Sequence, residues 1–347
     1  MRLGINLDSR RVHENGRKEI FGVRSRVAPC PEDGAGAVSL LTKRVGGGAR
    51  EIIACMRAPA RLYVILARDA PTGVIFRRGP SKRVLLISWN LETDTFVPGQ
   101  WLKGRVYEDR CDVSPGGDLL LYFAADPRRP YYAWTAISRP PYLTALALWP
   151  QTDTRLGGGL FENQTSIALD HPGIDSELAD GFTLPPWLRV GRFQRRGSWT
   201  QDDSLWGARL KRDGWRLTSA PGRLTERDSE GLARWEPPQV WEKEHPLAPG
   251  RYRLRMTHVV LSQDRPWYVA AYDVLDGSSP ARLGSLEWAE WDRTGDLLFA
   301  MNGALYRLRQ NHGVLLPLEQ ADVIADFSGL TFEECEPSMD AQRWPLR

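Results

Sequence analysis

A hairpin pattern that occurs twice in this sequence restricts the folds open to the chain. The segment AEWDRTGDLLFAMN, residues 289–302, aligns without gaps to CDVSPGGDLLLYFA, residues 111–124. In each copy the turn begins with a side chain that can hydrogen-bond the turn backbone, Ser114 or Asp292, and a glycine three residues later supplies a positive φ. A Leu-rich strand then returns. The pattern therefore predicts antiparallel hairpins as a recurring unit.

Weaker copies of the hairpin extend the pattern along the chain. Residues 158–171 and 257–274 have the same order of strand, turn and strand without the turn glycine. The first strands of the units are placed near Val64, Val113, Phe161, Leu210, Leu261 and Trp291. Their intervals are 49, 48, 49, 51 and 30 residues, against roughly 40 to 45 residues for a propeller blade. The spacing predicts an all-β fold, a β-propeller of about six blades, with five or seven blades as alternatives.

A β-sandwich is the other architecture that such hairpins can build, because all hairpins share the same turn chemistry. The two differ in their inner strands, since a propeller covers both faces of each sheet. DLLLYFAA (118–125) and DLLFAM (296–301) are apolar without alternation, which favours the propeller. The 32 Gly, 25 Pro and 14 Trp among 347 residues also suit many short strands joined by turns.

The two best copies resemble a known class of repeat. CDVSPGGDLLLYFA and EWAEWDRTGDLLFAMNGALYRL (287–308) are similar to the strand-turn-strand units of WD-repeat and TolB-like β-propellers, in which a short turn precedes a Leu-rich inner strand. The resemblance covers about a third of the chain, and the Gly-His dipeptide and regular Trp-Asp endings of WD repeats are missing. The same segments also resemble uncharacterised bacterial proteins of this length. The resemblance implies a propeller and no particular activity.

The N-terminal residues differ in composition from the rest. Residues 1–55 contain no Trp or Tyr and one Phe, and their ten Lys and Arg outnumber their six Asp and Glu. Of the total charge of +3, these residues contribute +4 and leave residues 56–347 at −1. Because the segment after Met56 is typical of a protein start, we expect residues 1–55 to be a disordered or non-native extension. Residues 56–347 are expected to form the propeller domain.

The charge and hydropathy patterns also bear on partners and location. The nearly neutral residues 56–347 disfavour nucleic acid, whose phosphate backbone requires a one-sided positive surface. No apolar run of about 18 residues is present, and the first 30 residues have no secretory apolar segment. We therefore expect a cytoplasmic protein that binds neither nucleic acid nor membranes.

Catalytic and metal-binding motifs are absent from the sequence. There is no GxSxG, HExxH or Walker motif, and the five histidines never occur in pairs at metal-ligand spacing. The cysteines are Cys30, Cys55, Cys111 and Cys335, and their spacing is that of neither a CxxC zinc site nor a disulfide framework. These absences predict no catalytic residue, no metal and no cofactor. His258, within MTHVVL, is expected to be a hydrogen-bonded strand residue.

One basic loop is a candidate ligand site. Within FRRGPSKR, residues 76–83, the predicted ligand-binding residues are Arg77, Arg78, Lys82 and Arg83. Backbone N–H groups of the Gly-Pro turn and the guanidinium groups could bind a phosphate or carboxylate, so we predict a small anionic ligand here. The alternative is a charged hairpin tip that keeps the protein soluble.

Carboxylates and tryptophans give weaker indications. A propeller glycosidase carries its acid and base on different blades and leaves no contiguous motif. The candidate carboxylates, by residue type alone, are Asp109, Asp112, Asp170, Asp175, Glu177, Glu242 and Glu244. The tryptophans in Pro- or Gly-rich segments, where exposure would allow stacking on sugars, are Trp134, Trp149, Trp187, Trp199 and Trp235. Most tryptophans are expected to fill the space between blades.

Two functional hypotheses follow from these patterns. The preferred one is a noncatalytic binding or scaffold protein that presents a rigid rim or a central opening to a protein or small ligand. The alternative is a propeller hydrolase or lectin that acts on glycans. Carboxylates gathered at one mouth of the ring would favour the enzyme, and an uncharged mouth beside an apolar rim would favour the scaffold.

Overall fold

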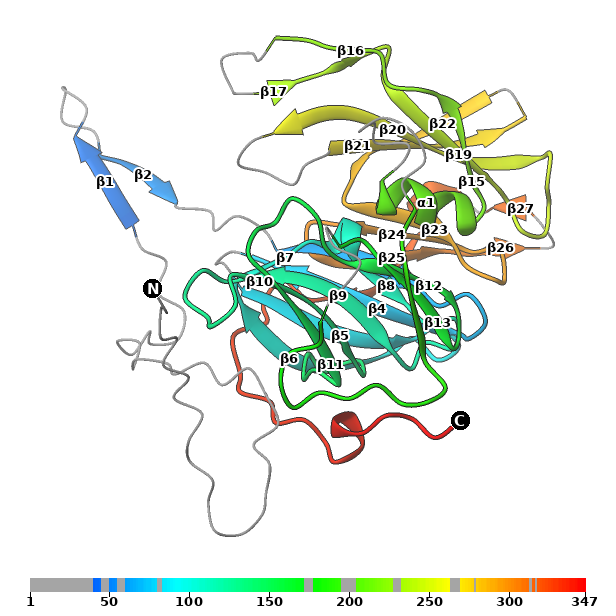
Figure 1. Ribbon diagram of the computed structural model, residues 1–347. Coiled ribbons are helices and arrows are strands. Elements are labelled where there is room, and N and C mark those ends of the chain that lie inside the picture. The colour runs from blue at the N-terminus through cyan, green and yellow to red at the C-terminus, as the bar shows by residue number, and fades with distance from the viewer. Residues whose placement is uncertain are drawn as a thin grey trace.

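A computed structural model describes residues 40–44, 50–54, 60–79, 83–171, 177–194, 204–226, 232–262, 269–277, 279–311, 314–315 and 317–347. Its first two strands, β1 (Leu40–Arg44) and β2 (Arg50–Ala54), form a hairpin that pairs with no other described strand and stands apart from the sheets (Figure 1). The rest of residues 1–55 lies outside the described residues. The N-terminal extension therefore stays a prediction.

Five β-sheets follow one another along the chain and form the blades of a propeller. Blade 1 contains β3 (Arg61–Leu66), β4 (Thr72–Arg78), β5 (Arg83–Asn90) and β6 (Thr95–Lys103). Blade 2 contains β7 (Arg105–Val106), β8 (Asp112–Val113), β9 (Leu120–Ala125), β10 (Ala133–Ser138) and β11 (Ala147–Gln151). Blade 3 contains β12 (Gly159–Asn163), β13 (Ser166–Leu169) and β14 (Arg189–Arg192), which runs parallel to β13.

The last two blades carry most of the irregular strands. Blade 4 contains β15 (Trp215–Ser219), β17 (Leu232–Ala233), β19 (Gln239–Glu244), β20 (Tyr252–Ser262), β21 (Val269–Asp276) and β22 (Ser279–Leu286). Blade 5 contains β23 (Trp288–Trp291), β24 (Leu297–Met301), β25 (Ala304–Leu308) and β28 (Asp322–Asp326). Two small two-stranded sheets are β16 (Arg223–Leu224) with β18 (Trp235–Glu236), and β26 (Gln310–Asn311) with β27 (Val314–Leu315).

The all-β propeller prediction is confirmed, with the blade number at five, one of the predicted alternatives. Four predicted unit starts, near Val64, Val113, Phe161 and Trp291, lie in the first part of blades 1, 2, 3 and 5. The other two starts do not open blades. Leu210 lies in a helix and Leu261 lies in β20, inside blade 4, so two predicted intervals belong to a single blade.

The repeated hairpins have the turn chemistry that the sequence predicts. Asp292 accepts a backbone hydrogen bond from Asp296 (2.9 Å), and Ser114 accepts one from Leu119 (3.0 Å). The turn glycines of the two copies have φ values of 78° and 86°, in the left-handed region that glycine tolerates.

The hydrophobic core lies between the blades. On one face of β4, Val74 and Phe76 pack in a cluster with Leu120 and Tyr122 of blade 2. On the opposite face, Ile75 packs in a cluster that includes residues of blade 5. This two-sided burial explains the apolar strands without alternation, since both faces of a blade exclude water.

The junction between blades 3 and 4 is different. The described apolar clusters join blade 1 to blade 2, blade 2 to blade 3, blade 4 to blade 5 and blade 5 to blade 1, and none of them joins blade 3 to blade 4. Helix α1 (Leu205–Arg212) contacts β12 of blade 3 and β15 of blade 4 there. Ser204 begins the helix, and its Oγ accepts a hydrogen bond from Gly207 N (3.1 Å), a normal N-cap.

The ring closes between blade 5 and blade 1 without a shared strand, because each of these blades is built from one continuous stretch of chain. Arg307 of blade 5 pairs with Asp292 (2.5 Å) and Asp296 (3.1 Å) in its own blade and with Asp94 of blade 1 (2.8 Å). Arg307 is only 3% exposed, so these ion pairs are largely screened from water. They connect the first blade to the last.

The C-terminal segment adds a second connection. After β28 the chain runs along blades 1 to 3 (red in Figure 1). Phe332 packs edge-on against Trp101 of blade 1 (6.1 Å between ring centres), and Trp344 packs edge-on against Trp187 near blade 3 (5.7 Å). The C-terminal segment therefore packs against both blade 1 and the chain near blade 3.

Candidate functional site

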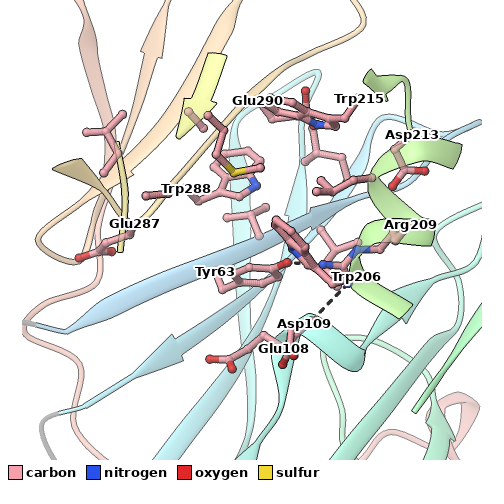
Figure 2. Close-up of a pocket in the computed structure, with 18 of the residues that line it drawn as sticks. Tyr63, Glu108, Asp109, Trp206, Arg209, Asp213, Trp215, Glu287, Trp288 and Glu290 are labelled. Carbon is pink, nitrogen blue, oxygen red and sulfur yellow. Dashed lines mark hydrogen bonds between the residues drawn. The ribbon is translucent and has the colours of Figure 1, made fainter. Parts of the chain in front are cut away.

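A cavity of about 820 Å³ lies between helix α1 and residues of blades 1, 2, 4 and 5, and Figure 2 shows part of its wall. Its wall is formed by β3 of blade 1, the 3-10 helix η1 (Glu108–Arg110), α1, and strands of blades 4 and 5. These elements come together because β3 packs beside β23 and β24, and α1 packs on η1. The cavity is thus a product of the ring and belongs to no single blade.

Aromatic side chains make up much of the wall. They are Tyr63, Tyr107, Trp206, Trp215, Tyr272, Trp288 and Trp291. Trp206 of α1 stacks on the ring of His258 in β20 (4.7 Å between ring centres) and meets Trp241 edge-on (5.8 Å). Because these rings are held by packing on their far sides, they form a rigid apolar lining.

Charged side chains are the second component of the wall. Among the described residues, eight Arg and Lys side chains line the cavity against five Asp and Glu side chains. A half-enclosed space with excess positive charge attracts anions, since its low-dielectric walls focus the field.

Most of these charges already have partners within the protein. Glu108 accepts two hydrogen bonds from Arg78 (3.0 and 3.1 Å) and pairs with Arg61 (3.6 Å). Glu290 pairs with Lys243 (2.9 Å) and accepts a hydrogen bond from Trp215 Nε1 (2.9 Å). These carboxylates are therefore occupied by groups of the cavity wall.

Helix α1 supplies two arginines that anchor it to the neighbouring blades. Arg212 pairs with the fully buried Asp112 of β8 (2.5 and 2.9 Å) and with Asp213 (2.8 Å). Arg209 donates to the carbonyls of Glu108 and Cys111 and to the Tyr63 hydroxyl (Figure 2). Helix and blades are thus tied by buried charge-assisted hydrogen bonds, which are about twice as strong as neutral ones.

Two carboxyl groups of the wall have raised pKa values. Burial raises the pKa of Glu287, although its Oε2 accepts a hydrogen bond from Leu62 N (2.7 Å) that opposes the rise. Burial also raises the pKa of Asp109, Arg110 opposes this, and the nearby charge of Glu108 adds to it. Asp109 lies below Arg209 and beside Glu108 in Figure 2. In its protonated form, a carboxyl group can donate as well as accept a hydrogen bond.

The four residues predicted from the basic loop lie apart from one another. Arg77 is 1% exposed and donates to the carbonyls of Phe327 (3.0 Å) and Ser328 (2.9 Å). Arg78 points to the other face of β4, binds Glu108 and lines the cavity. Arg83 lies over the ring of Phe332 (4.4 Å). Lys82 is outside the described residues, so an anion site at this loop stays a prediction, and the described arginines have other partners.

The other candidate carboxylates have varied surroundings. Of the six that the structure describes, Asp109 alone lines the cavity. Asp112, Asp170 and Glu242 are buried, and Glu242 pairs with Arg253 and Arg255 (3.0 and 2.7 Å). Glu244 accepts a backbone hydrogen bond from Gly250, Glu177 is exposed, and Asp175 lies outside the described residues.

The candidate tryptophans and the histidines are mostly interior residues. Trp134 and Trp149 are buried, Trp187 and Trp235 are half-buried, and Trp199 lies outside the described residues. His171, His245 and His258 are buried, and His258 lies in a strand as predicted. No group of three metal-ligating side chains occurs among the described residues, and none of the described helices is long and apolar enough to cross a membrane.

The sequence reasoning missed most of the cavity wall, including Tyr63, Glu108, Trp206, Arg209 and Glu290. These residues come from four parts of the chain, up to 227 positions apart, and share no local motif. One indication was present: Arg77 and Arg78 are neighbours on a strand, so their side chains must point to opposite faces.

The similarity of this chain to known proteins is low. No protein-family model and no curated protein matches the sequence. The β-propeller domain of the Trilobed protease from Pyrococcus furiosus is similar over 75% of this chain and 85% of that one, at 13% identity and a TM-score of 0.28. A candidate 6-phosphogluconolactonase from Bacteroides fragilis is similar over 78% of this chain and 96% of that one, at 10% identity and a TM-score of 0.28. Likenesses this distant carry no argument about the fold or the activity of this chain.

Proposed function

We propose that the protein binds a small organic anion with a ring in the cavity between helix α1 and blades 1, 2, 4 and 5. The supporting observation is the composition of the wall, where aromatic side chains enclose about 820 Å³ and eight Arg and Lys residues face five Asp and Glu. Small-molecule sites have volumes of about 300 to 1,000 Å³ and combine apolar walls with a few polar groups. The cavity fits that class better than it fits a flat protein-binding rim.

The ring of the ligand is suggested by the aromatic lining. Tyr63, Trp206 and Trp288 come from blade 1, α1 and blade 5, so a planar ligand can be covered from several sides. Their side chains are held by packing, which lowers the entropy lost on binding. Offset or edge-on contacts between rings contribute about 0.5 to 1.5 kcal/mol beyond the burial of area.

The anionic part is suggested by donors that the protein leaves available. Arg68 Nε is buried in the wall and has no hydrogen-bond partner in the described structure, although its Nη2 donates to Phe161 O (3.1 Å). Arg105 stacks over Tyr107 (4.5 Å) and forms no ion pair with a described residue. A ligand carboxylate or phosphate would satisfy such groups.

Calorimetric titration with benzoate tests this proposal, because benzoate combines an aromatic ring with one negative charge. Ala270→Phe adds bulk to the cavity wall and is expected to weaken benzoate binding at least about tenfold, or 1.4 kcal/mol. Ala281→Phe adds the same bulk at an exposed position of β22 and should bind as the parent does. Absence of binding by the parent, or equal binding by both variants, would contradict a ligand site in the cavity.

A glycan-acting propeller is the second candidate. Two carboxyl groups with raised pKa values, Asp109 and Glu287, line the same cavity, and glycosidases use a pair of carboxyl groups in different protonation states. Screening with nitrophenyl glycosides tests this candidate. Turnover that disappears in Asp109→Asn would favour the hydrolase, and absence of turnover by the parent would favour noncatalytic binding.

A further inference from the structure

Asp109 differs from the other acidic residues of the cavity wall. Glu108, Glu287 and Glu290 each accept a hydrogen bond from another residue of the protein at 2.7 to 3.0 Å, and Asp213 pairs with Arg212 at 2.8 Å. For Asp109, no Arg or Lys nitrogen of the described residues lies within 4.0 Å of the carboxylate. Asp109 is half-buried and lines the cavity, so its carboxyl group is the acidic group of the wall that a ligand can engage.

The charged and titratable groups around Asp109 do not neutralise it. Glu108 and Arg110 face it from η1, Arg209 faces it from α1, and Tyr63 faces it from β3. Arg209 is engaged with backbone carbonyls and the Tyr63 hydroxyl.

The remaining neighbours of Asp109 are equally engaged. Arg110 donates to Thr154 O (2.8 Å) and lies over the rings of Tyr107 and Phe123. The thiol of Cys111 is buried, and burial raises its pKa well above the ordinary value, so it stays neutral. Burial thus raises the pKa of Asp109, and no described Arg or Lys forms an ion pair with its carboxylate in an otherwise positive cavity.

On the basis of the proposed function, we propose that the cavity takes up an organic carboxylate together with one proton, which Asp109 holds against a carboxylate oxygen of the ligand. Two carboxylates in contact cannot both remain ionised, and one proton shared between them removes the repulsion. A buffer acid or hydronium ion gives up the proton, so its own N–H or O–H bond breaks while an O–H bond forms on the Asp109 carboxylate. The new Asp109 hydroxyl then donates a hydrogen bond to the ligand carboxylate. A carboxylate suits this role because its oxygens can share a proton with a neighbouring carboxyl group.

Tyr63 supplies a second donor to the same place. Its hydroxyl oxygen accepts from Arg209, which leaves its own proton for another acceptor. Burial raises the pKa of Tyr63 to about 12, so the hydroxyl stays protonated at neutral pH. Tyr63 can therefore donate to the carboxylate that Asp109 binds.

The test measures proton uptake during calorimetric titration with benzoate. Titrations at pH 6.5 in buffers of different ionisation enthalpy, PIPES and imidazole, give the number of protons taken up per benzoate. We expect uptake of a substantial fraction of one proton by the parent and uptake near zero by Asp109→Asn. Asp153→Asn alters a surface carboxylate whose side chain is 50% exposed and should leave proton uptake unchanged. Benzenesulfonate has the same ring and charge but cannot hold a proton, so it should bind the parent without uptake and more weakly.

The pH dependence of the parent gives a test that needs no variant. The Kd of benzoate should rise with pH between 5 and 8, by up to about tenfold per unit where one proton is taken up. The Kd of benzenesulfonate should depend much less on pH. Benzoate binding without proton uptake, or uptake that persists in a folded Asp109→Asn, would overturn the role of Asp109 and leave the cavity as a ligand site. Absence of benzoate binding would overturn the proposed function and this inference together.

Discussion

Arg307→Leu is expected to open the joint between blade 5 and blade 1. The substitution removes the partner of three carboxylates, Asp94, Asp292 and Asp296, whose side chains are 23%, 4% and 11% exposed. It also removes a hydrogen bond from Nη2 to Leu91 O (3.2 Å). Breaking a buried ion pair by removing one partner costs about 3 to 5 kcal/mol, because the remaining charge is left uncompensated. We expect a loss of that size in the free energy of unfolding.

Equilibrium unfolding in urea, followed by tryptophan fluorescence, measures this loss. The urea midpoint should fall while the slope m stays constant, since the surface exposed on unfolding is unchanged. Arg309→Leu is the matched control: Arg309 lies two residues away on the same chain segment, and its pair with Asp322 is exposed on both sides (55% and 59%). Its removal should cost about 0.5 kcal/mol or less. If the two variants have equal stabilities, the buried cluster does not hold the ring closed.

Three further substitutions test other parts of the structure. Gly295→Ala should lower the free energy of unfolding in urea by about 1 to 3 kcal/mol, because φ is +86° and a Cβ would lie 2.6 Å from His245 Cε1. Gly250→Ala, with φ of +81° and no atom within 4 Å of the added Cβ, should lower it by about 1 kcal/mol. Equal losses in the two variants would contradict the packing argument. Arg212→Leu leaves the fully buried Asp112 uncompensated and should cost about 3 to 5 kcal/mol, and the exposed Arg216→Leu should change the urea midpoint little. Burial lowers the pKa of His171 to about 4, whereas a histidine of the unfolded chain has a pKa of about 6.5. The unfolded state therefore binds the proton first, and the free energy of unfolding falls as the pH drops from about 6.5 to about 4. His171→Gln should reduce that fall by about 3 kcal/mol, and an unchanged pH profile would show that His171 is not buried in its neutral form.

The sequence predicts the regular blades because their information is local. A Ser or Asp, a glycine three residues later and a Leu-rich strand are enough to define the hairpins of blades 2 and 5. Blade 4 escapes this reasoning. Its first strand follows an eight-residue helix, and β17 joins the sheet from a stretch that carries no hairpin pattern. The assumption of equally spaced blades therefore predicted two blade starts wrongly, one in helix α1 and one in β20.

The candidate site could not be predicted in this way, because its residues come from distant parts of the sequence. Asp109 was one of seven candidate carboxylates, and nothing near it in sequence shows that Tyr63 and Arg209 lie beside it. Of the predicted basic loop, Arg78 lines the cavity, whereas Arg77 is buried and donates a hydrogen bond to the carbonyl of Phe327. The choice between an anion site and a structural arginine depends on partners about 250 residues away.

A crystal structure with 4-bromobenzoate, located by the anomalous scattering of bromine, tests the central claim most directly. The claim is that the cavity between helix α1 and blades 1, 2, 4 and 5 is a ligand site for an organic carboxylate. It predicts bromine inside the cavity, with the ligand carboxylate within hydrogen-bond distance of Asp109 and Tyr63. Bromobenzoate bound elsewhere on the protein, with the cavity empty at a saturating concentration, would contradict it.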